Sequence, residues 1–268
     1  MKPAAFAYVR PKDWPQALQL VAEGARAGAG TQSLGPLLNL RLAQPGTIVD
    51  LRHLPGFSGI SQRGGGVRIG AGTTHAAIED GAVPGRTGEI MAAVARRIAY
   101  RPVRNRGTIG GSLAHADPAG DWVAVLPALG ATAIALGPGG ERRIPAARYV
   151  SGIFETALGA DELLCAIEVP VLPAEARWGH WKFCRKPGEF SKATACVLSV
   201  PAHPPRAVLA ALDAPPLVVE DASALLADPA TEAPHIVAHI AELTELTDWR
   251  RALAETALRR AVAMAVGA

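Results

Sequence analysis

The stretch VRNRGTIGGSLAHADPAGD, from Val103 to Asp121, carries the clearest structural signal in this chain. It joins a basic start to the paired glycines Gly110 and Gly111, which hydroxyls flank at Thr108 and Ser112. Paired glycines let a backbone turn tightly and let a ligand approach it closely, and successive N–H groups in such a turn form an anion-binding concavity. Glycine pairs also occur in ordinary hairpin turns. The length and mixed chemistry of this run favour a loop that holds phosphate or pyrophosphate.

A second glycine-rich stretch, GAGTQS at Gly28–Ser33, differs from the G-x-G-x-x-G dinucleotide motif in its last residue. That motif also needs a helix directly after the loop, and here Gly35 and Pro36 interrupt the segment that follows. We therefore reject a Rossmann fold and keep a nucleotide-binding loop of another kind. Its donors would be backbone amides and the side chains of Thr31, Gln32 and Ser33.

Other polar clusters give weaker signals. His115 and Asp117 form an H-x-D pair, but a metal site needs a third ligand, so we predict loop anchoring and no metal site. Glu79 and Asp80 are expected to be solvated residues rather than a general acid–base pair, and no catalytic residue is predicted. A group of cations fits a solvated strand face and a cation source for an anionic cofactor equally well: Lys182, Arg185, Lys186 and Lys192. Two donor-rich loops without a catalytic residue indicate a carrier of a dinucleotide that does the chemistry itself.

The composition is that of a globular protein with room for one large domain or two ordinary ones. The 268 residues are 49% hydrophobic and 19% charged. The net charge of +3 comes without a basic block with interleaved aromatics, so no nucleic-acid partner is predicted. Three widely spaced cysteines fit a reducing compartment, and without a CxxC they hold no four-cysteine cluster. The N-terminus lacks the apolar segment of a signal peptide, and Trp122–Leu136 is too short to span a bilayer, so we expect a cytoplasmic protein.

The order of the expected elements indicates an α+β fold. Helices are expected at 13–24, 89–100, 121–131 and 247–265, with a short one after Thr73 or Thr74. Strands are expected at 47–54, 66–74 and 161–170, in a hairpin at 131–145, and in an antiparallel pair within 179–202. Strands and helices interleave without regular alternation, which argues against a doubly wound sheet. A domain boundary is predicted at 171–179.

In these motifs the chain resembles the flavin-carrying medium subunit of the molybdenum hydroxylases. This is the family of carbon monoxide dehydrogenase, xanthine dehydrogenase and related aldehyde and N-heterocycle oxidoreductases. The run VRNRGTIGGSLAHADPAGD is similar to the most specific signature of the family, and AGTQSLGPLLNLRLAQP resembles its AGGQSLLPLLKLR-type loop. IGAGTTHAAIE resembles its second-strand motif, WKFCRKPGEFSKAT its K-x-x-R-R-x-G-D-[FW]-A strand, and DWRRALAETALRRAV its closing helix.

The resemblance covers nearly the whole chain and implies a PCMH-type FAD-binding fold, shared with vanillyl-alcohol oxidase, followed by a smaller α+β C-terminal domain. Residues 1–172 would form the FAD-binding domain, with subdomains of about 1–54 and 55–172. Residues 176–268 would form the C-terminal domain. Noncovalent FAD would lie between the two domains.

Carried over by position, the resemblance also implies which residues bind the cofactor. One side of the FAD pyrophosphate would contact Ala27, Gly28, Ala29, Gly30, Thr31, Gln32, Ser33 and Leu34. The other side would contact Thr108, Ile109, Gly110, Gly111 and Ser112. Asp121 would bond the ribitol or nearby backbone, Ile98 and Leu164 would flank the flavin ring, and Lys182 would lie near its edge.

The chain departs from the family pattern at a few of these positions. Thr31 stands where the family has its second glycine. Glu189 and Ser191 stand where Asp and Ala are usual, and Lys186 replaces the second Arg of the late strand motif. The first departure affects the shape of the glycine-rich loop, and the others affect the surroundings of the flavin.

The function implied by the resemblance is electron transfer within a heterotrimer. An aldehyde, an N-heterocycle or CO would be oxidised at the molybdenum cofactor of a large partner subunit. Electrons would pass through two [2Fe-2S] clusters of a small partner subunit to FAD on this chain and then to an external acceptor, and two heterotrimers could pair into a dimer. The alternatives are a self-sufficient FAD-dependent oxidoreductase of the same fold, which would need a positioned acid or base, and a nucleotide-binding module without redox chemistry.

Overall fold

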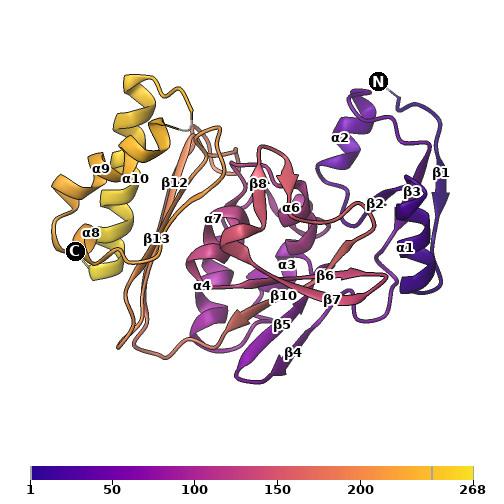
Figure 1. Cartoon of the computed structure of the whole chain (residues 1–268), viewed down its shortest axis with the longest axis horizontal. Helices are drawn as coiled ribbons and strands as arrows, with labels where there is room; N and C mark the ends of the chain where they lie inside the picture. The colour runs from indigo at the N-terminus through magenta and orange to yellow at the C-terminus, as the bar shows by residue number, and fades with distance from the viewer. Residues whose placement is uncertain (1, 243, 268) are drawn as a thin grey trace.

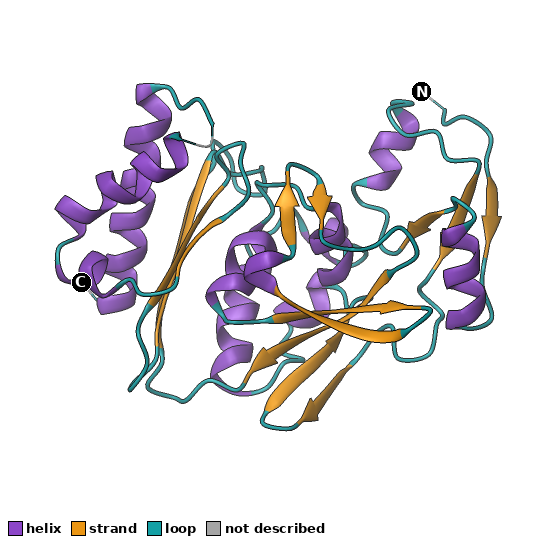
Figure 2. Ribbon diagram, viewed as in Figure 1, coloured by secondary structure: helices purple, strands orange, loops and turns teal. Residues whose placement is uncertain are grey.

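The computed structural model describes residues 2–242 and 244–267. Three larger sheets follow one another along the longest axis of the molecule, from the N-terminal unit to the C-terminal unit (Figure 1). Helices lie against each sheet (Figure 2). The α+β fold class expected from the sequence is confirmed. Within the described ranges, no helix combines the length and the hydrophobicity needed to cross a bilayer.

The first sheet is small and parallel, with the strand order β1 (Ala7–Val9), β3 (Thr47–Asp50), β2 (Arg26–Gly28). Parallel pairing puts the carboxyl ends of these strands at one edge, so Gly28 lies beside Asp50. Helix α1 (Trp14–Ala22), expected at 13–24, is capped by Asp13, whose side chain accepts a hydrogen bond from the Gln16 amide. The segment after β2 forms a short helix, α2 (Leu34–Asn39). Pro36 does not prevent it, because first-turn N–H groups need no helical partner.

The central sheet is antiparallel, in the order β4 (Ile60–Arg63), β5 (Gly66–Gly70), β10 (Leu163–Pro170), β6 (Thr132–Gly137), β7 (Gly140–Pro145). The helices of this unit are α3 (His75–Glu79), α4 (Gly85–Ala95), α5 (Arg101–Arg104), α6 (Ile109–His115) and α7 (Asp121–Ala128). The side chains of Ile69 and Ile167 are fully buried in the main core. A 3-10 turn, η1 (Ala146–Arg148), leads to a small hairpin of β8 (Val150–Gly152) and β9 (Glu155–Thr156).

The third sheet is antiparallel, in the order β11 (Arg177–Phe183), β12 (Ala193–Ser199), β13 (Arg206–Ala210), β14 (Leu217–Val219). Helices α8 (Ser223–Ala227), α9 (Pro229–Ala241) and α10 (Asp248–Val266) share a separate apolar core with one face of this sheet. A Cβ at Gly179 would lie 1.9 Å from the Ala261 carbonyl oxygen, so α10 packs directly on the backbone of β11. The opposite face meets α7 of the central unit (Figure 1).

One helix differs clearly from its expected range. The sequence predicts a helix at 89–100, whereas α4 begins at Gly85 and ends at Ala95. Ala99 adopts a left-handed φ of 42°, and the carbonyls of Ile98 and Ala99 accept hydrogen bonds from the Arg104 side chain at 2.8 and 3.1 Å. The apolar period continues to Ile98, but the amides of Arg97 and Ile98 already donate to carbonyls three residues back, and the left-handed Ala99 ends the helical path.

Candidate cofactor-binding site

The stretch Ala29–Leu34 joins the end of β2 to the start of α2 and leaves its backbone amides free. None of its six N–H groups donates to any residue that the structure describes; the first amide with a partner is that of Gly35, which donates to the Thr31 carbonyl at 2.8 Å. The Gln32 side chain donates to the Gly30 carbonyl at 3.0 Å and closes the turn. Successive free amides at the start of a helix are suited to bind an anion.

Thr31, which stands where the family has a glycine, has a backbone conformation that suits glycine. Thr31 adopts a φ of 56°, in the left-handed region. Glycine populates this region without steric cost, whereas another L-residue pays about 1–2 kcal/mol. Thr31 therefore adopts the type of conformation for which glycine is suited, at a local cost.

The second predicted stretch, Thr108–Ser112, is not a loop but the start of α6, which corrects our interpretation of the glycine pair. Thr108 is the N-cap, and its hydroxyl accepts a hydrogen bond from the Gly111 amide at 3.0 Å. The other amides are also bonded within the protein, Ile109 to Thr73, Gly110 to Ala71 and Ser112 to Thr108. Free amides were predicted in both glycine-rich stretches; they are absent from 109–112 and present at 29–34.

The glycines of both stretches allow the two segments to lie close together. A Cβ at Gly30 would be 2.0 Å from the Arg106 carbonyl oxygen. A Cβ at Gly111 would lie 3.9 Å from the Cβ of Ala29, and Gly111 is exposed. The structure therefore brings the two sets of predicted residues together, with Gly111 facing the segment that carries the free amides.

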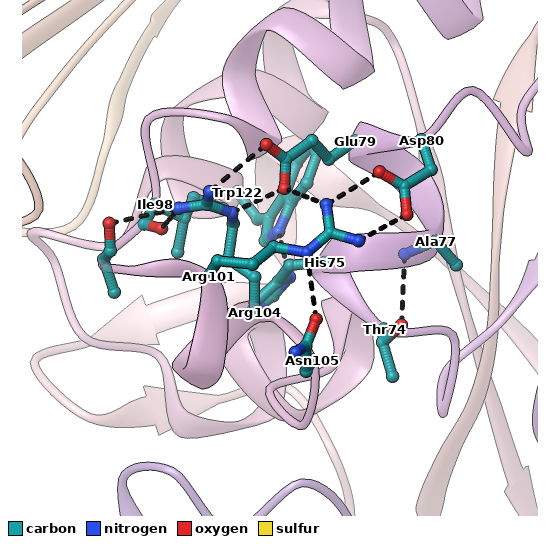
Figure 3. Close-up of polar contacts among 11 residues, drawn as sticks. Thr74, His75, Ala77, Glu79, Asp80, Ile98, Arg101, Arg104, Asn105 and Trp122 are labelled. Atoms are coloured by element: carbon teal, nitrogen blue, oxygen red, sulfur yellow. Dashed lines mark hydrogen bonds and ion pairs between the residues drawn. The ribbon is translucent and has the colours of Figure 1, made fainter.

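An arginine cluster holds the segment that precedes Thr108 (Figure 3). Arg104 Nε donates to Glu79 Oε2 at 2.7 Å, and its Nη2 donates to Glu79 Oε1 at 3.2 Å. Arg101 pairs with both Glu79 and Asp80. The Arg104 hydrogen bond holds the pKa of Glu79 below its usual value. The expectation of solvated residues was wrong for Glu79, whose ion-paired side chain is only 12% exposed, and is confirmed for Asp80, which is ion-paired with Arg101 but 56% exposed.

The buried His75 also holds the segment that precedes Thr108. Trp122 Nε1 donates to His75 Nδ1 at 3.1 Å (Figure 3), and the His75 amide donates to the Gly107 carbonyl at 2.9 Å. Burial, with help from the charge of Arg104, lowers the pKa of His75 to about 4. The imidazole is therefore neutral near pH 7, and its Nδ1 is an acceptor.

We expect Arg104→Ala to lower the free energy of unfolding by about 2 kcal/mol, because Glu79 would keep only Arg101 as a partner and the two backbone carbonyls that Arg104 binds would lose their donor. Arg96→Ala is the matched control, since Arg96 is exposed and lies on the same connection. Urea denaturation of the purified chain measures both values. Equal losses for the two variants would show that the cluster does not hold this segment.

A second buried ion pair lies next to α6. Asp121 begins α7, and a Cβ at the preceding Gly120 would lie 3.6 Å from the Ser112 hydroxyl. Lys182 Nζ, on β11, donates to Asp121 Oδ2 at 2.8 Å and to the Arg97 carbonyl at 2.9 Å. The two side chains are 4% and 9% exposed. Burial raises the pKa of Asp121, and the charge of Lys182 opposes this.

The cations of the late strand motif do not act as one group. Lys182 points into the protein, whereas three others are exposed: Arg185, Lys186 and Lys192.

Of the remaining predicted residues, Ile98 is half-buried after α4, and Leu164 lies in the main core on β10. His115 stacks on Phe154 with ring centroids 5.0 Å apart, and Asp117 accepts a bond from the Ala119 amide at 2.9 Å, in agreement with loop anchoring.

The structure places a run of free backbone amides where a small parallel sheet meets a helix-covered antiparallel sheet. The family model for the FAD binding domain in molybdopterin dehydrogenase matches residues 4–172, and the chain belongs to this family. The family prediction is confirmed, and with it the assignment to the oxidoreductases.

Individual relatives agree with this assignment. The nicotine 6-hydroxylase medium subunit of Paenarthrobacter nicotinovorans is 38% identical over 200 residues, which are 74% of this chain and 70% of that protein. The carbon monoxide dehydrogenase medium chain of Afipia carboxidovorans is 39% identical over 202 residues, with the same coverage. A structure of CO dehydrogenase from Oligotropha carboxidovorans superposes with a TM-score of 0.89 and 32% identity, and the match covers 100% of this chain and 99% of that one.

Proposed function

We propose that the chain is the FAD-carrying electron-transfer subunit of a heteromeric molybdenum hydroxylase. The observation that carries this proposal is the run of six free amides at Ala29–Leu34, opposite the exposed face of Gly111. A pyrophosphate is an anion that accepts several hydrogen bonds at once, and amides at the start of a helix satisfy it well. The hydroxyls of Thr31 and Ser33 add donors within the same segment, and Ser112 follows Gly111 on α6.

The remaining residues fit the rest of such a cofactor. Asp121 Oδ1 is buried and has no partner among the described residues; a carboxylate oxygen has two acceptor sites, so beside the neighbouring His180 ring it can also accept a hydrogen bond from a hydroxyl such as those of ribitol. Lys182 holds the other oxygen of Asp121 and fixes the orientation of the carboxylate. When bound, FAD supplies reversible one- and two-electron redox chemistry, while the residues of this chain bind it, orient it and set its electrostatic surroundings.

The relatives support the proposed partners. Proteins named as the medium subunit of nicotine 6-hydroxylase and the medium chain of carbon monoxide dehydrogenase are similar to this chain over 74% of its length. We therefore propose a cytoplasmic complex with a large subunit that carries the molybdenum cofactor and a small subunit that carries two [2Fe-2S] clusters. Electrons would arrive from those clusters and leave to an external acceptor. Residues 1–172 and 176–268 are the proposed FAD-binding and C-terminal domains.

The experiment that tests this proposal is the release of flavin from the purified native chain. We expect acid precipitation to leave FAD in the supernatant, because the proposed contacts are hydrogen bonds and ion pairs rather than covalent links. Chromatography of the supernatant identifies the flavin, with commercial FAD and FMN as standards. A flavin that stays with the pellet, FMN in the supernatant, or a chain without any flavin would contradict the proposal.

A further inference from the structure

A cluster of polar groups lies where β11 approaches α7 and the segment after α4, and we call it the Asp121 cluster: the buried Asp121, His180 and Lys182, with the exposed Arg97 at its edge. His180 and Lys182 are two residues apart on β11 and therefore share one face of the sheet. Hydrogen bonds run in both directions between β11 and the segment that follows α4. Lys182 donates to Asp121 and to the Arg97 carbonyl, while Arg97 Nη1 donates to the His180 carbonyl at 2.8 Å. The cluster thus fixes the C-terminal sheet against the unit that carries α6.

Two members of the Asp121 cluster have polar atoms without partners. Among the described residues, Asp121 Oδ1 and both ring nitrogens of His180 make no hydrogen bond, although all three atoms are buried. The His180 side chain is 1% exposed, and its Nε2 lies 3.6 Å from Asp121 Oδ1. Buried polar atoms are rarely left unpaired, because leaving them so is costly. A small adjustment of the imidazole would make Nε2 a donor to Asp121 Oδ1.

The charges around His180 require a neutral ring. Burial, together with the positive charges of Arg97 and Lys182, lowers the pKa of His180 to about 3. On β12, Cys196 lies opposite His180 in the strand register, and burial raises its thiol pKa to about 12, so this neighbour is also neutral. A neutral imidazole carries one N–H group, and the carboxylate oxygen beside Nε2 decides which nitrogen keeps it.

We propose that His180 is a positioning residue for the flavin site: as a neutral Nε2–H donor it keeps Asp121 ionised and so keeps Lys182 ion-paired. This inference rests on the proposed function, because it assigns a role toward the flavin. Burial already favours the protonated form of Asp121. Without the donor, Asp121 would take up a proton more readily, and the charge of Lys182 would no longer be balanced. An unbalanced cation near the flavin would favour its reduced, anionic form.

The first test needs no flavin. Long-range proton–nitrogen NMR spectra of the purified chain with 15N-labelled histidine report the tautomer and charge of each imidazole. We expect His180 to remain the neutral Nε2–H tautomer from about pH 5.5 to 8, in line with its lowered pKa. A Nδ1–H tautomer, or a ring that becomes charged in this range, would overturn the proposal whether or not the chain binds FAD. His180→Gln assigns the signal.

The second test measures the midpoint potential of the bound flavin in His180→Phe and His180→Gln. Gln keeps a neutral N–H donor, and Phe keeps only the ring volume. We expect His180→Phe to raise the ratio of reduced-flavin to oxidised-flavin affinity about tenfold, which is about 30 mV for a two-electron couple, and His180→Gln to restore the wild-type potential. The matched control is His203→Phe, at an exposed turn.

The outcomes separate this inference from the proposed function. Equal shifts in His180→Phe and His180→Gln, or no shift in either, would show that His180 only fills space. If His180→Phe does not fold, the NMR test decides alone. A wild-type chain without flavin would contradict the proposed function, and the tautomer of His180 would then still test its contact with Asp121.

Discussion

Gly111→Val is expected to weaken FAD binding by at least about 100-fold while the chain keeps its fold. Gly111 is exposed in the first turn of α6, and a Cβ there would lie 3.9 Å from the Cβ of Ala29 and 2.7 Å from the Thr108 hydroxyl, so the Thr108 side chain would have to shift slightly. A branched side chain would occupy the space between α6 and the free amides of Ala29–Leu34. The pyrophosphate would then lose hydrogen bonds worth about 1.5–3 kcal/mol each when one partner is charged, and two such bonds suffice for the expected loss.

Gly35→Val is the matched control for this variant. Gly35 lies in the first turn of α2, and a Cβ there would meet no atom within 4 Å. Flavin occupancy from the absorbance spectrum and secondary structure from circular dichroism are measured for both variants. Normal flavin occupancy in Gly111→Val would show that the pyrophosphate does not lie between these segments.

The second large effect concerns reduction of the flavin. We expect the isolated flavoprotein to stay oxidised when it is mixed anaerobically with aldehydes or N-heterocycles, and to be reduced once the proposed large and small subunits are added. The sequence provides no credible acid or base for direct oxidation of an organic substrate. In the proposed complex, electrons arrive instead across a contact with the small subunit, and a stable contact buries about 1,200–2,000 Å².

Bleaching of the visible flavin absorbance measures this reduction. The control is chemical reduction of the isolated chain by dithionite, which shows that its flavin is redox-active without partners. Rapid reduction by an organic substrate in the isolated chain would contradict the role as a subunit and would favour the self-sufficient oxidoreductase.

The sequence predicted free backbone amides in both proposed cofactor-binding segments, and the structure has them in only the first, at 29–34. At 109–112 the paired glycines predict a loop, because glycine is a poor helix former. The helix α6 forms there because Thr108 caps it and because the carbonyls of Ala71 and Thr73 bind its first amides. Those carbonyls lie far away in the sequence, so no local pattern could show that the amides are taken.

The ion pairs of the site were equally hidden from the sequence. Glu79 and Arg104 are 25 residues apart, and Asp121 and Lys182 are 61 residues apart. The family resemblance places Asp121 and Lys182 near the cofactor, but it does not predict that they bond to each other. Only the packing of the third sheet on α7, through β12 and β13, brings them together.

Titration of the flavin-free chain with FAD, FMN and riboflavin tests the proposed cofactor site most directly. The site offers its free amides to a pyrophosphate, which FAD has and the two smaller flavins lack. We expect FAD to bind to one site per chain, and FMN and riboflavin to bind at least about 100-fold more weakly, a difference of about 2.7 kcal/mol. Equal affinities for FAD and riboflavin would contradict a site built around the amides of Ala29–Leu34.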